Sequence, residues 1–196
     1  GWTQEQKTEA WTAIVLEKIC NQAKTLVENG HEGEAAMLTG YMRELVPGDA
    51  TNREGHAAKV YFNALFGKSF SRGQENPINA ALNYGYGLIL SAFNREVTLC
   101  GYLPHIGLCH DNMFNPYNLS CDMMEPFRAI VDRKVIDIAP VEFGKKEKLE
   151  LLGILHSPVR IAGAEHTVMN AVKLYSRSVF DAIELSDADR INFIEL

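Results

Sequence analysis

The stretch "NPINAALNYGYGLILSAFNREV", Asn76 to Val97, predicts a long helix that other segments must pack around. Asparagine is a favoured residue just before a helix, and proline is tolerated in the first helical turn. Apolar residues then recur at helical spacing with no further proline. Gly85 and Gly87 lie inside this pattern, and glycine within a helix indicates a close approach to a neighbouring element.

Helical patterns fill most of the rest of the chain. Thr3-x-x-Gln6 has the form of a capping box, and the apolar stripe after it ends at Gly30. Further helices are expected over Glu32–Leu45, from Asn52 to Gly67, near 123–138, near 145–155 and after Thr167. The sequence therefore predicts an all-α fold, a compact helical bundle with long helices and at most a short extended segment near 158–162.

Length and charge set limits on the function. A chain of 196 residues with 46% hydrophobic residues suits one sizeable domain with a core. The net charge of −6 is concentrated at the two ends, since residues 1–50 carry eight acids against four bases and residues 165–196 six against three. Residues 51–164 hold 12 bases and 11 acids, so this part permits a phosphate partner without requiring one.

Other sequence features indicate the cellular environment. No window approaches the ~18 uninterrupted apolar residues of a membrane helix, and no signal-peptide pattern occurs, so no membrane partner is expected. The four cysteines form no C-x-x-C pair, and their intervals of 80, 9 and 12 residues fit no common zinc spacing. Two of them sit in apolar surroundings typical of a buried free thiol, and a reduced, cytoplasmic protein is the simpler interpretation. The start at Gly1, directly in a helical pattern, predicts a piece of a longer protein with a preceding domain.

A second stretch, "IGLCHDNMFNPYNLSCDMMEPFR", combines polar and apolar residues and allows several interpretations. Asp122 and Glu125 have the spacing of a capping box before the helix expected near 123–138. Glu125 and Arg128, three residues apart, are also spaced for a surface ion pair. His110 lies in a polar loop, where a lone histidine is usually solvated. Glu54, in the first turn of its helix, has the ordinary explanation of favouring the helix dipole.

Four segments taken together are more specific than any single residue. "EGHAAKVYFNALFG", "NPINAALNYGYGLILSAF", "GYLPHIGLCH" and "DMMEPFR" occur in this order. They resemble the CRISPR-associated adaptation integrase, the family that captures foreign DNA into CRISPR arrays, with spacings closest to the branch that accompanies Cas9-type effectors. The resemblance runs from the first helix to about residue 185.

The resemblance implies a set of site residues. Glu54, His110 and Glu125 match the family's catalytic metal ligands, and Asp122 would orient or support them. Apart from the resemblance, Lys59 lies five residues after Glu54 and Arg128 three after Glu125, so both are candidates to contact DNA phosphates, with a plain surface charge as the alternative for each. One imidazole and two carboxylates suit Mg²⁺ or Mn²⁺. No role carries over to Cys109.

The resemblance also implies the reaction and the partners. Residues 1–196 would be the helical catalytic domain of a metal-dependent DNA endonuclease and integrase. This enzyme would join the 3′-hydroxyl ends of protospacer DNA into the CRISPR leader-repeat by phosphodiester exchange. A small companion adaptation protein and a homodimer of the full-length protein are expected, while the family's N-terminal β-rich domain would precede Gly1. The alternative is a non-catalytic DNA-binding or assembly module, in which the acids cap helices and His110 is incidental.

Overall fold

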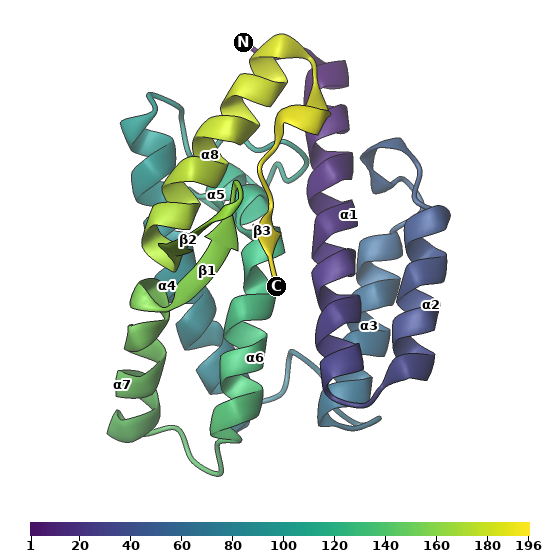
Figure 1. Ribbon diagram of the computed structural model, residues 1–196, viewed down its shortest axis with the longest axis vertical. Helices are drawn as coiled ribbons and strands as arrows, with labels where there is room; N and C mark the ends of the chain where they lie inside the picture. The colour runs from purple at the N-terminus through teal and green to yellow at the C-terminus, as the bar shows by residue number, and fades with distance from the viewer.

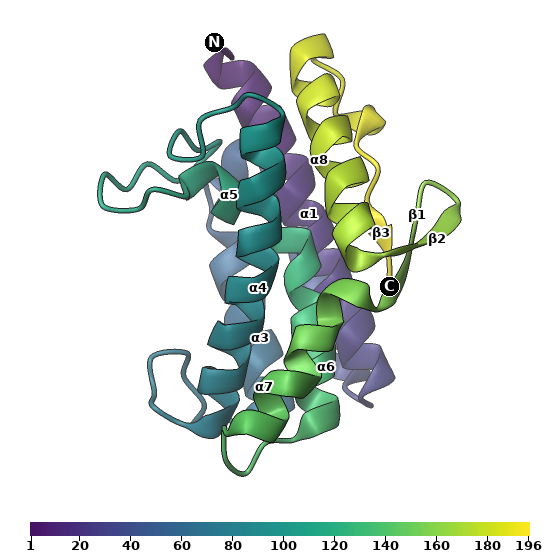
Figure 2. The ribbon, with the colours of Figure 1, turned by 90° about the vertical axis from the view of Figure 1, so that its left-hand side faces the viewer.

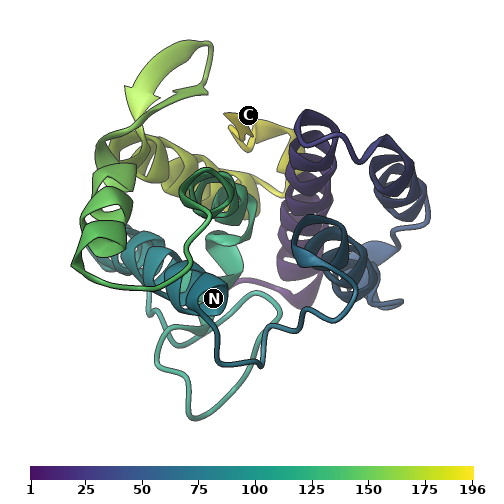
Figure 3. The same ribbon diagram turned by 90° about the horizontal axis from the view of Figure 1, so that it is seen from below.

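Helix α1 separates two groups of helices, with α2 and α3 on one side and the remaining helices on the other (Figures 1 and 3). The computed structural model describes all 196 residues. The α-helices are α1 (Gln4–Glu28), α2 (Glu32–Arg43), α3 (Arg53–Phe66), α4 (Pro77–Leu99), α5 (Asn118–Met123), α6 (Arg128–Ile138), α7 (Lys145–Leu152) and α8 (Val168–Leu185). Short 3-10 turns are η1 (Pro47–Asp49), η2 (Glu125–Phe127), η3 (Gly153–His156) and η4 (Ala188–Arg190). The strands are β1 (Pro158–Ile161), β2 (Ala164–Thr167) and β3 (Ile194–Glu195).

One continuous core of 38 buried apolar residues joins the two groups. Helix α4 packs against α5, α6, α7 and α8, and α1 contacts α2, α3, α6 and α8 (Figure 2). Aromatic rings connect three of these elements at the centre. Phe127 of η2 has its ring centroid 5.1 Å from that of Phe93 on α4 and 5.2 Å from that of Tyr175 on α8. The turn before α6 is therefore fixed in the core by aromatic packing.

The start of α4 and one of its glycines behave as the sequence predicts. Asn76 accepts a hydrogen bond from the backbone N–H of Asn79 at 2.8 Å. Gly85 is needed for close packing, because a Cβ atom there would collide with the side chain of Val131 on α6. A Cβ at Gly87 would meet nothing within 4 Å. The prediction of a close approach is confirmed for Gly85 and wrong for Gly87.

Most predicted helix starts are confirmed because local side chains cap them. Thr3 and Gln6 form the expected capping box at the start of α1. The side chain of Asn52 accepts the N–H of Gly55 at α3, and Thr167 accepts the N–H of Asn170 at α8. Such caps satisfy backbone donors that have no partner within the helix, so they can be predicted from a few neighbouring residues.

The expected fold class is right for the helices but misses a small sheet. The single extended segment near 158–162 is β1, the central strand of an antiparallel sheet in the order β2-β1-β3. A two-residue turn joins β1 to β2, and its residues Ala162 and Gly163 have φ values of 52° and 76°. Alanine at a left-handed turn position gives a weaker signal than the usual Asn-Gly. Strand β3 comes from the end of the chain, where Ile194 lies opposite Ile161, so its pairing is non-local.

Two other structural facts bear on the expected environment. No helix has both the length and the hydrophobicity that crossing a membrane requires. The four cysteines are free thiols, and none of them, including the two expected to be buried, is fully buried. Cys109 is exposed and the other three are half-buried.

Candidate metal centre

The loop that carries His110 is folded around the carboxylate of Asp122, which lies on α5 and is fully buried. One Asp122 oxygen, Oδ2, accepts the backbone N–H groups of Leu108 at 2.7 Å, Cys109 at 2.9 Å and His110 at 3.2 Å. Gly107 makes this tight loop possible, since a Cβ atom there would collide with the His110 carbonyl and lie 2.8 Å from Asp122 Oδ2. The carboxylate therefore determines the shape of the loop.

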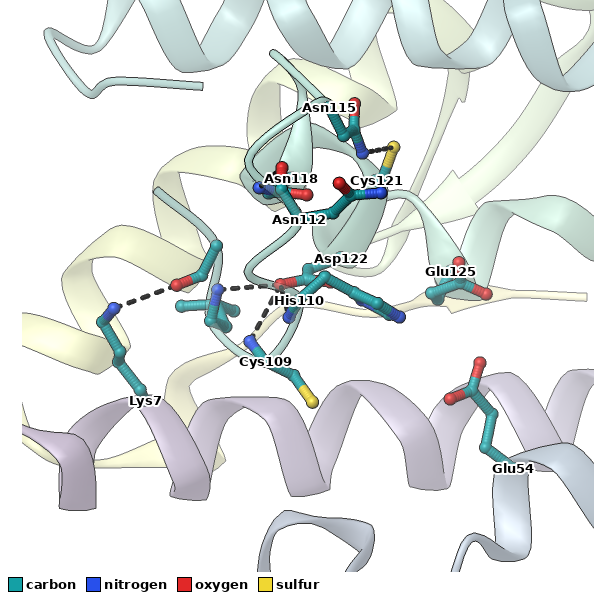
Figure 4. A network of polar contacts seen from close by, with 12 residues as sticks. Lys7, Glu54, Cys109, His110, Asn112, Asn115, Asn118, Cys121, Asp122 and Glu125 are labelled. Atoms are coloured by element: carbon teal, nitrogen blue, oxygen red, sulfur yellow. Dashed lines mark hydrogen bonds and ion pairs between the residues drawn. The ribbon is translucent and has the colours of Figure 1, made fainter. Parts of the chain in front are cut away.

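Asp122 also orients the imidazole of His110. Its other oxygen, Oδ1, contacts His110 Nδ1 (Figure 4). A carboxylate only accepts hydrogen bonds, so in the neutral ring Nδ1 carries the proton and Nε2 has the lone pair. The hydrogen bond to Asp122 raises the pKa of His110 against the effect of burial, and the charges of Asp122, Glu54 and Glu125 raise it further. A histidine held in this way is the usual arrangement of a metal ligand.

Two side chains of helix α1 also contact this loop. The ammonium of Lys7 donates to the carbonyl oxygen of Gly107 at 3.0 Å. One turn further along α1, the ring of Trp11 meets the His110 ring edge-on, with centroids 5.6 Å apart. The loop is thus held between α1 and α5.

The predicted capping box is wrong. Asp122 lies inside α5 rather than ahead of a helix, and the expected helix near 123–138 is divided into α5, η2 and α6. Pro126 explains the division, because it lacks an N–H donor and its ring crowds the carbonyl four residues earlier. No side chain caps α6. Asp122 and Glu125 therefore contact different residues and do not cap the same helix.

Glu125 is a buried carboxylate held by two cations. It is 5% exposed, and its Oε1 accepts a hydrogen bond from Arg128 Nε at 2.9 Å. Its Oε2 contacts the ammonium of Lys18 as an ion pair. Asn21 on α1 fixes the turn by donating to the carbonyl oxygen of Pro126 at 3.1 Å. Burial alone would raise the pKa of Glu125, but Arg128 and Lys18 outweigh it and lower the pKa to about 2.

Glu54 reaches the same place from the first turn of α3. The carboxylate of Asp49 accepts the backbone N–H groups of Arg53 at 2.7 Å and of Glu54 at 3.0 Å. Together with the Asn52 cap, this fixes the start of the helix. The Glu54 side chain is 21% exposed and its Oε1 contacts the Lys18 ammonium.

Lys18 is the residue that the sequence analysis missed. It is 9% exposed, and its ammonium contacts both Glu54 and Glu125. Burial would lower the pKa of Lys18, but the charges of Glu125 and Glu54 outweigh it and raise the pKa above its ordinary value. A signal was present in the sequence. Lys18 follows Ile14 and Val15 at helical spacing, so it lies on the apolar face of α1, where an unpaired lysine is costly.

The two candidate DNA contacts differ. Lys59 is exposed on α3 and forms no ion pair, as a free surface charge would. Arg128 is paired with Glu125 as the spacing predicted, although the pair is largely buried rather than on the surface. Its guanidinium also lies over the ring of Tyr86, 4.6 Å from the centroid.

A buried polar network extends from Arg128 into the core. The hydroxyl groups of Tyr86 and Tyr61 both donate to Asp132, the latter at 3.0 Å. Burial raises the pKa of Asp132 to about 6, although the two hydroxyl groups and the charges of Arg128 and Arg72 act against this increase. The network links α6 to α3 through Tyr61 and to α4 through Tyr86.

The structure thus brings the predicted residues together as two groups. One is Glu54 and Glu125 around Lys18, and the other is His110 with Asp122. It shows no cluster of three or more His, Cys, Asp or Glu side chains arranged to hold a metal ion. Figure 4 shows the His110 ring and the two glutamates turned toward one another. Two carboxylates that already converge on a cation, beside an imidazole nitrogen free to coordinate, are donors that fit Mg²⁺ or Mn²⁺.

The chain has clear relatives. The family model described as "CRISPR associated protein Cas1" matches residues 2–148. This chain belongs to the Cas1 family. The CRISPR-associated endonuclease Cas1 of Neisseria meningitidis serogroup C is 39% identical over 171 residues, covering 85% of this chain and 56% of that protein. The Francisella tularensis subspecies novicida relative is 28% identical over 184 residues, covering 82% and 58%. The chain therefore spans just over half the length of these Cas1 relatives.

Solved structures share the fold of this Cas1 chain. A partial Cas6-RT-Cas1–Cas2 complex aligns with a TM-score of 0.78 at 16% identity, covering 98% of this chain and 72% of that one. A casposase bound to an integration product aligns with a TM-score of 0.71 at 18% identity, covering 98% and 68%. The helical bundle and its small sheet are thus a fold shared with both structures.

Proposed function

We propose that residues 1–196 form the helical catalytic domain of a metal-dependent CRISPR-adaptation endonuclease and integrase. It would join the 3′-hydroxyl ends of protospacer DNA into the leader-repeat by phosphodiester exchange. One observation carries this proposal. Glu54 and Glu125, which lie 71 residues apart in the sequence, converge on a single buried cation beside a histidine whose Nδ1 contacts Asp122. Membership of the Cas1 family supports it.

In this proposal Glu54, Glu125 and Nε2 of His110 hold Mg²⁺ or Mn²⁺. The bound ion would neutralise charge on the reacting phosphate and lower the pKa of the attacking hydroxyl. The protein residues have separate tasks. Asp122 keeps the proton on His110 Nδ1, and Arg128 offsets the charge of the buried Glu125 carboxylate. The core packing of η2 keeps Glu125 in position, so little reorganisation accompanies the reaction.

The structural neighbours support a proposal about the partners. We infer that the substrate is double-stranded DNA, with Lys59 and Arg128 contacting its phosphates. One structural neighbour is a casposase bound to an integration product. Another is a complex that contains both Cas1 and Cas2. We therefore propose a Cas2-type companion and a homodimer of the full-length protein, acting in the cytoplasm.

Three substitutions test the proposed reaction. Glu54→Ala, His110→Ala and Glu125→Ala are made in the full-length protein, and Mn²⁺-dependent strand transfer is measured with the companion present. Metal ions contribute several kcal/mol to transition-state stabilisation, so each variant should lose roughly 100-fold or more in rate. Glu32→Ala is the matched control, because Glu32 is an exposed acid in the first turn of α2. It should retain full activity.

A non-catalytic DNA-binding or assembly module is the alternative. The observation in its favour is that Lys18 already satisfies Glu54 and Glu125 as a salt-bridge cluster. Full strand transfer by any two of the three alanine variants would overturn the assignment of Glu54, His110 and Glu125 as catalytic ligands, provided that their circular dichroism spectra show a native fold.

A further inference from the structure

Lys18 contacts both glutamates of the proposed metal site without belonging to the proposed ligand set. It extends from α1, while Glu54 comes from α3 and Glu125 from the turn before α6. The ammonium contacts Glu54 Oε1 and Glu125 Oε2, and the lysine side chain is only 10% exposed. One cationic group therefore joins two acids from elements that are distant in the sequence.

A lysine at this position has a cost that its contacts must offset. Its neighbours on the same face of α1, Ile14, Val15 and Ile19, are fully buried. An ammonium surrounded by such side chains is strongly destabilising unless it is paired with charged acceptors. The two carboxylates would repel each other without a cation between them. Lys18 and the glutamates thus depend on one another.

The charges of this cluster balance before any ion joins it. Two carboxylates, Glu54 and Glu125, stand against the ammonium of Lys18 and the guanidinium of Arg128. A divalent cation that binds the same carboxylates adds two positive charges next to two existing ones in a partly buried place. Like charges at such short range oppose binding, and the ammonium also contacts oxygen atoms that the ion requires.

We propose that Lys18 is an internal competitor of the divalent metal ion, which holds Glu54 and Glu125 together and lowers their affinity for that ion. This inference rests on the metal site of the proposed function. It makes Lys18 a positioning residue that determines how much Mg²⁺ or Mn²⁺ the site needs. The alternative roles for Lys18 are a contact to the DNA phosphate and a purely structural salt bridge. Neither of them predicts that removing the charge tightens metal binding.

The test compares Mn²⁺ binding by the 196-residue chain and its variants, measured by calorimetry and by the electron paramagnetic resonance signal of free Mn²⁺. Lys18→Met keeps the length and removes the charge, and Lys18→Gln does so with a polar side chain in case the methionine variant fails to fold. A neighbouring charge within ~4–6 Å shifts the affinity of a carboxylate for a proton by about 10-fold to 1,000-fold. We expect both variants to bind Mn²⁺ about tenfold or more tightly than the unmodified chain.

Two control variants show whether a change in Mn²⁺ affinity comes from the charge of Lys18 or from substitution of a lysine in α1. Lys18→Arg keeps the positive charge and should bind Mn²⁺ no more tightly than the unmodified chain. Lys24→Met removes a lysine from the same helix that forms no ion pair, so it should leave Mn²⁺ affinity unchanged. Thermal unfolding gives an independent readout. With EDTA, Lys18→Met should unfold at a lower temperature than the unmodified chain. Adding Mn²⁺ should raise the unfolding temperature of Lys18→Met by more than it raises that of the unmodified chain.

The outcomes distinguish this inference from the proposed function. If the unmodified chain binds Mn²⁺ through Glu54 and Glu125 while both neutral variants bind it no more tightly, Lys18 is not a competitor and the metal site stands. If neither the unmodified chain nor the neutral variants bind Mn²⁺, the metal site and this inference both fail. The proposed metal site and the competitor role of Lys18 are both supported only if the neutral variants bind Mn²⁺ more tightly than the unmodified chain does.

Discussion

Replacing Asp122 by asparagine tests how the histidine is held. The side chain keeps its shape and loses its charge, in a position that is 0% exposed. Asp122 accepts four contacts, three from backbone N–H groups and one from His110 Nδ1. Asparagine retains one acceptor oxygen and gains an amide donor. If that oxygen remains on the three backbone groups, the amide faces the imidazole.

The consequence for His110 is a change of tautomer. A donating amide requires Nδ1 to accept, so the proton moves to Nε2, and Nε2 can no longer coordinate a metal ion. Loss of a partner of this kind costs about 10- to 100-fold in metal affinity or activity. Changing charge-assisted hydrogen bonds to neutral ones should in addition lower the free energy of unfolding by about 2–3 kcal/mol.

Three measurements check this prediction. Calorimetry with Mn²⁺ gives the affinity, guanidinium unfolding in EDTA gives the stability, and nitrogen NMR of the His110 ring reports the tautomer. Asp111→Asn is the matched control, because Asp111 is an exposed acid next to His110 in the same loop. It should change none of these values. A folded Asp122→Asn protein with unchanged Mn²⁺ affinity and an unchanged tautomer would refute the orienting role of Asp122.

Two further predictions concern the core. The pKa of Asp132 is raised from 3.8 to about 6 by burial, so the native state binds a proton between these values that the unfolded chain does not. Native stability should therefore rise as the pH falls from 7 to 4, by about 2–3 kcal/mol relative to Asp132→Asn, as measured by urea unfolding at each pH; an equal pH dependence in both proteins would contradict this. Gly85→Ala should lower the free energy of unfolding by about 1–3 kcal/mol through its collision with Val131, whereas Gly87→Ala on the same helix should be neutral or stabilising. Equal effects of the two substitutions would show that Val131 moves freely.

Local chemistry made much of the fold predictable. The helices after Thr3, Asn52, Asn76 and Thr167 start where the sequence predicts, because each cap involves residues only a few positions apart. The candidate residues Glu54, His110 and Glu125 came from ordered motifs that resemble a known family, and their metal-binding role stays a prediction. These inferences need no knowledge of how distant segments meet.

Only the tertiary structure decided the features that depend on distant contacts. Strand β3 forms because the end of the chain reaches Ile161, which no local pattern indicates. Asp122 has the spacing of a helix cap, yet it lies inside α5 and binds a loop twelve residues earlier. Lys18 is a basic residue on an apolar stripe in the sequence. Its role is visible only because α1, α3 and the turn before α6 bring it against two carboxylates. The physical reason is the same in each case, since buried polar groups need partners and the fold determines which partners are within reach.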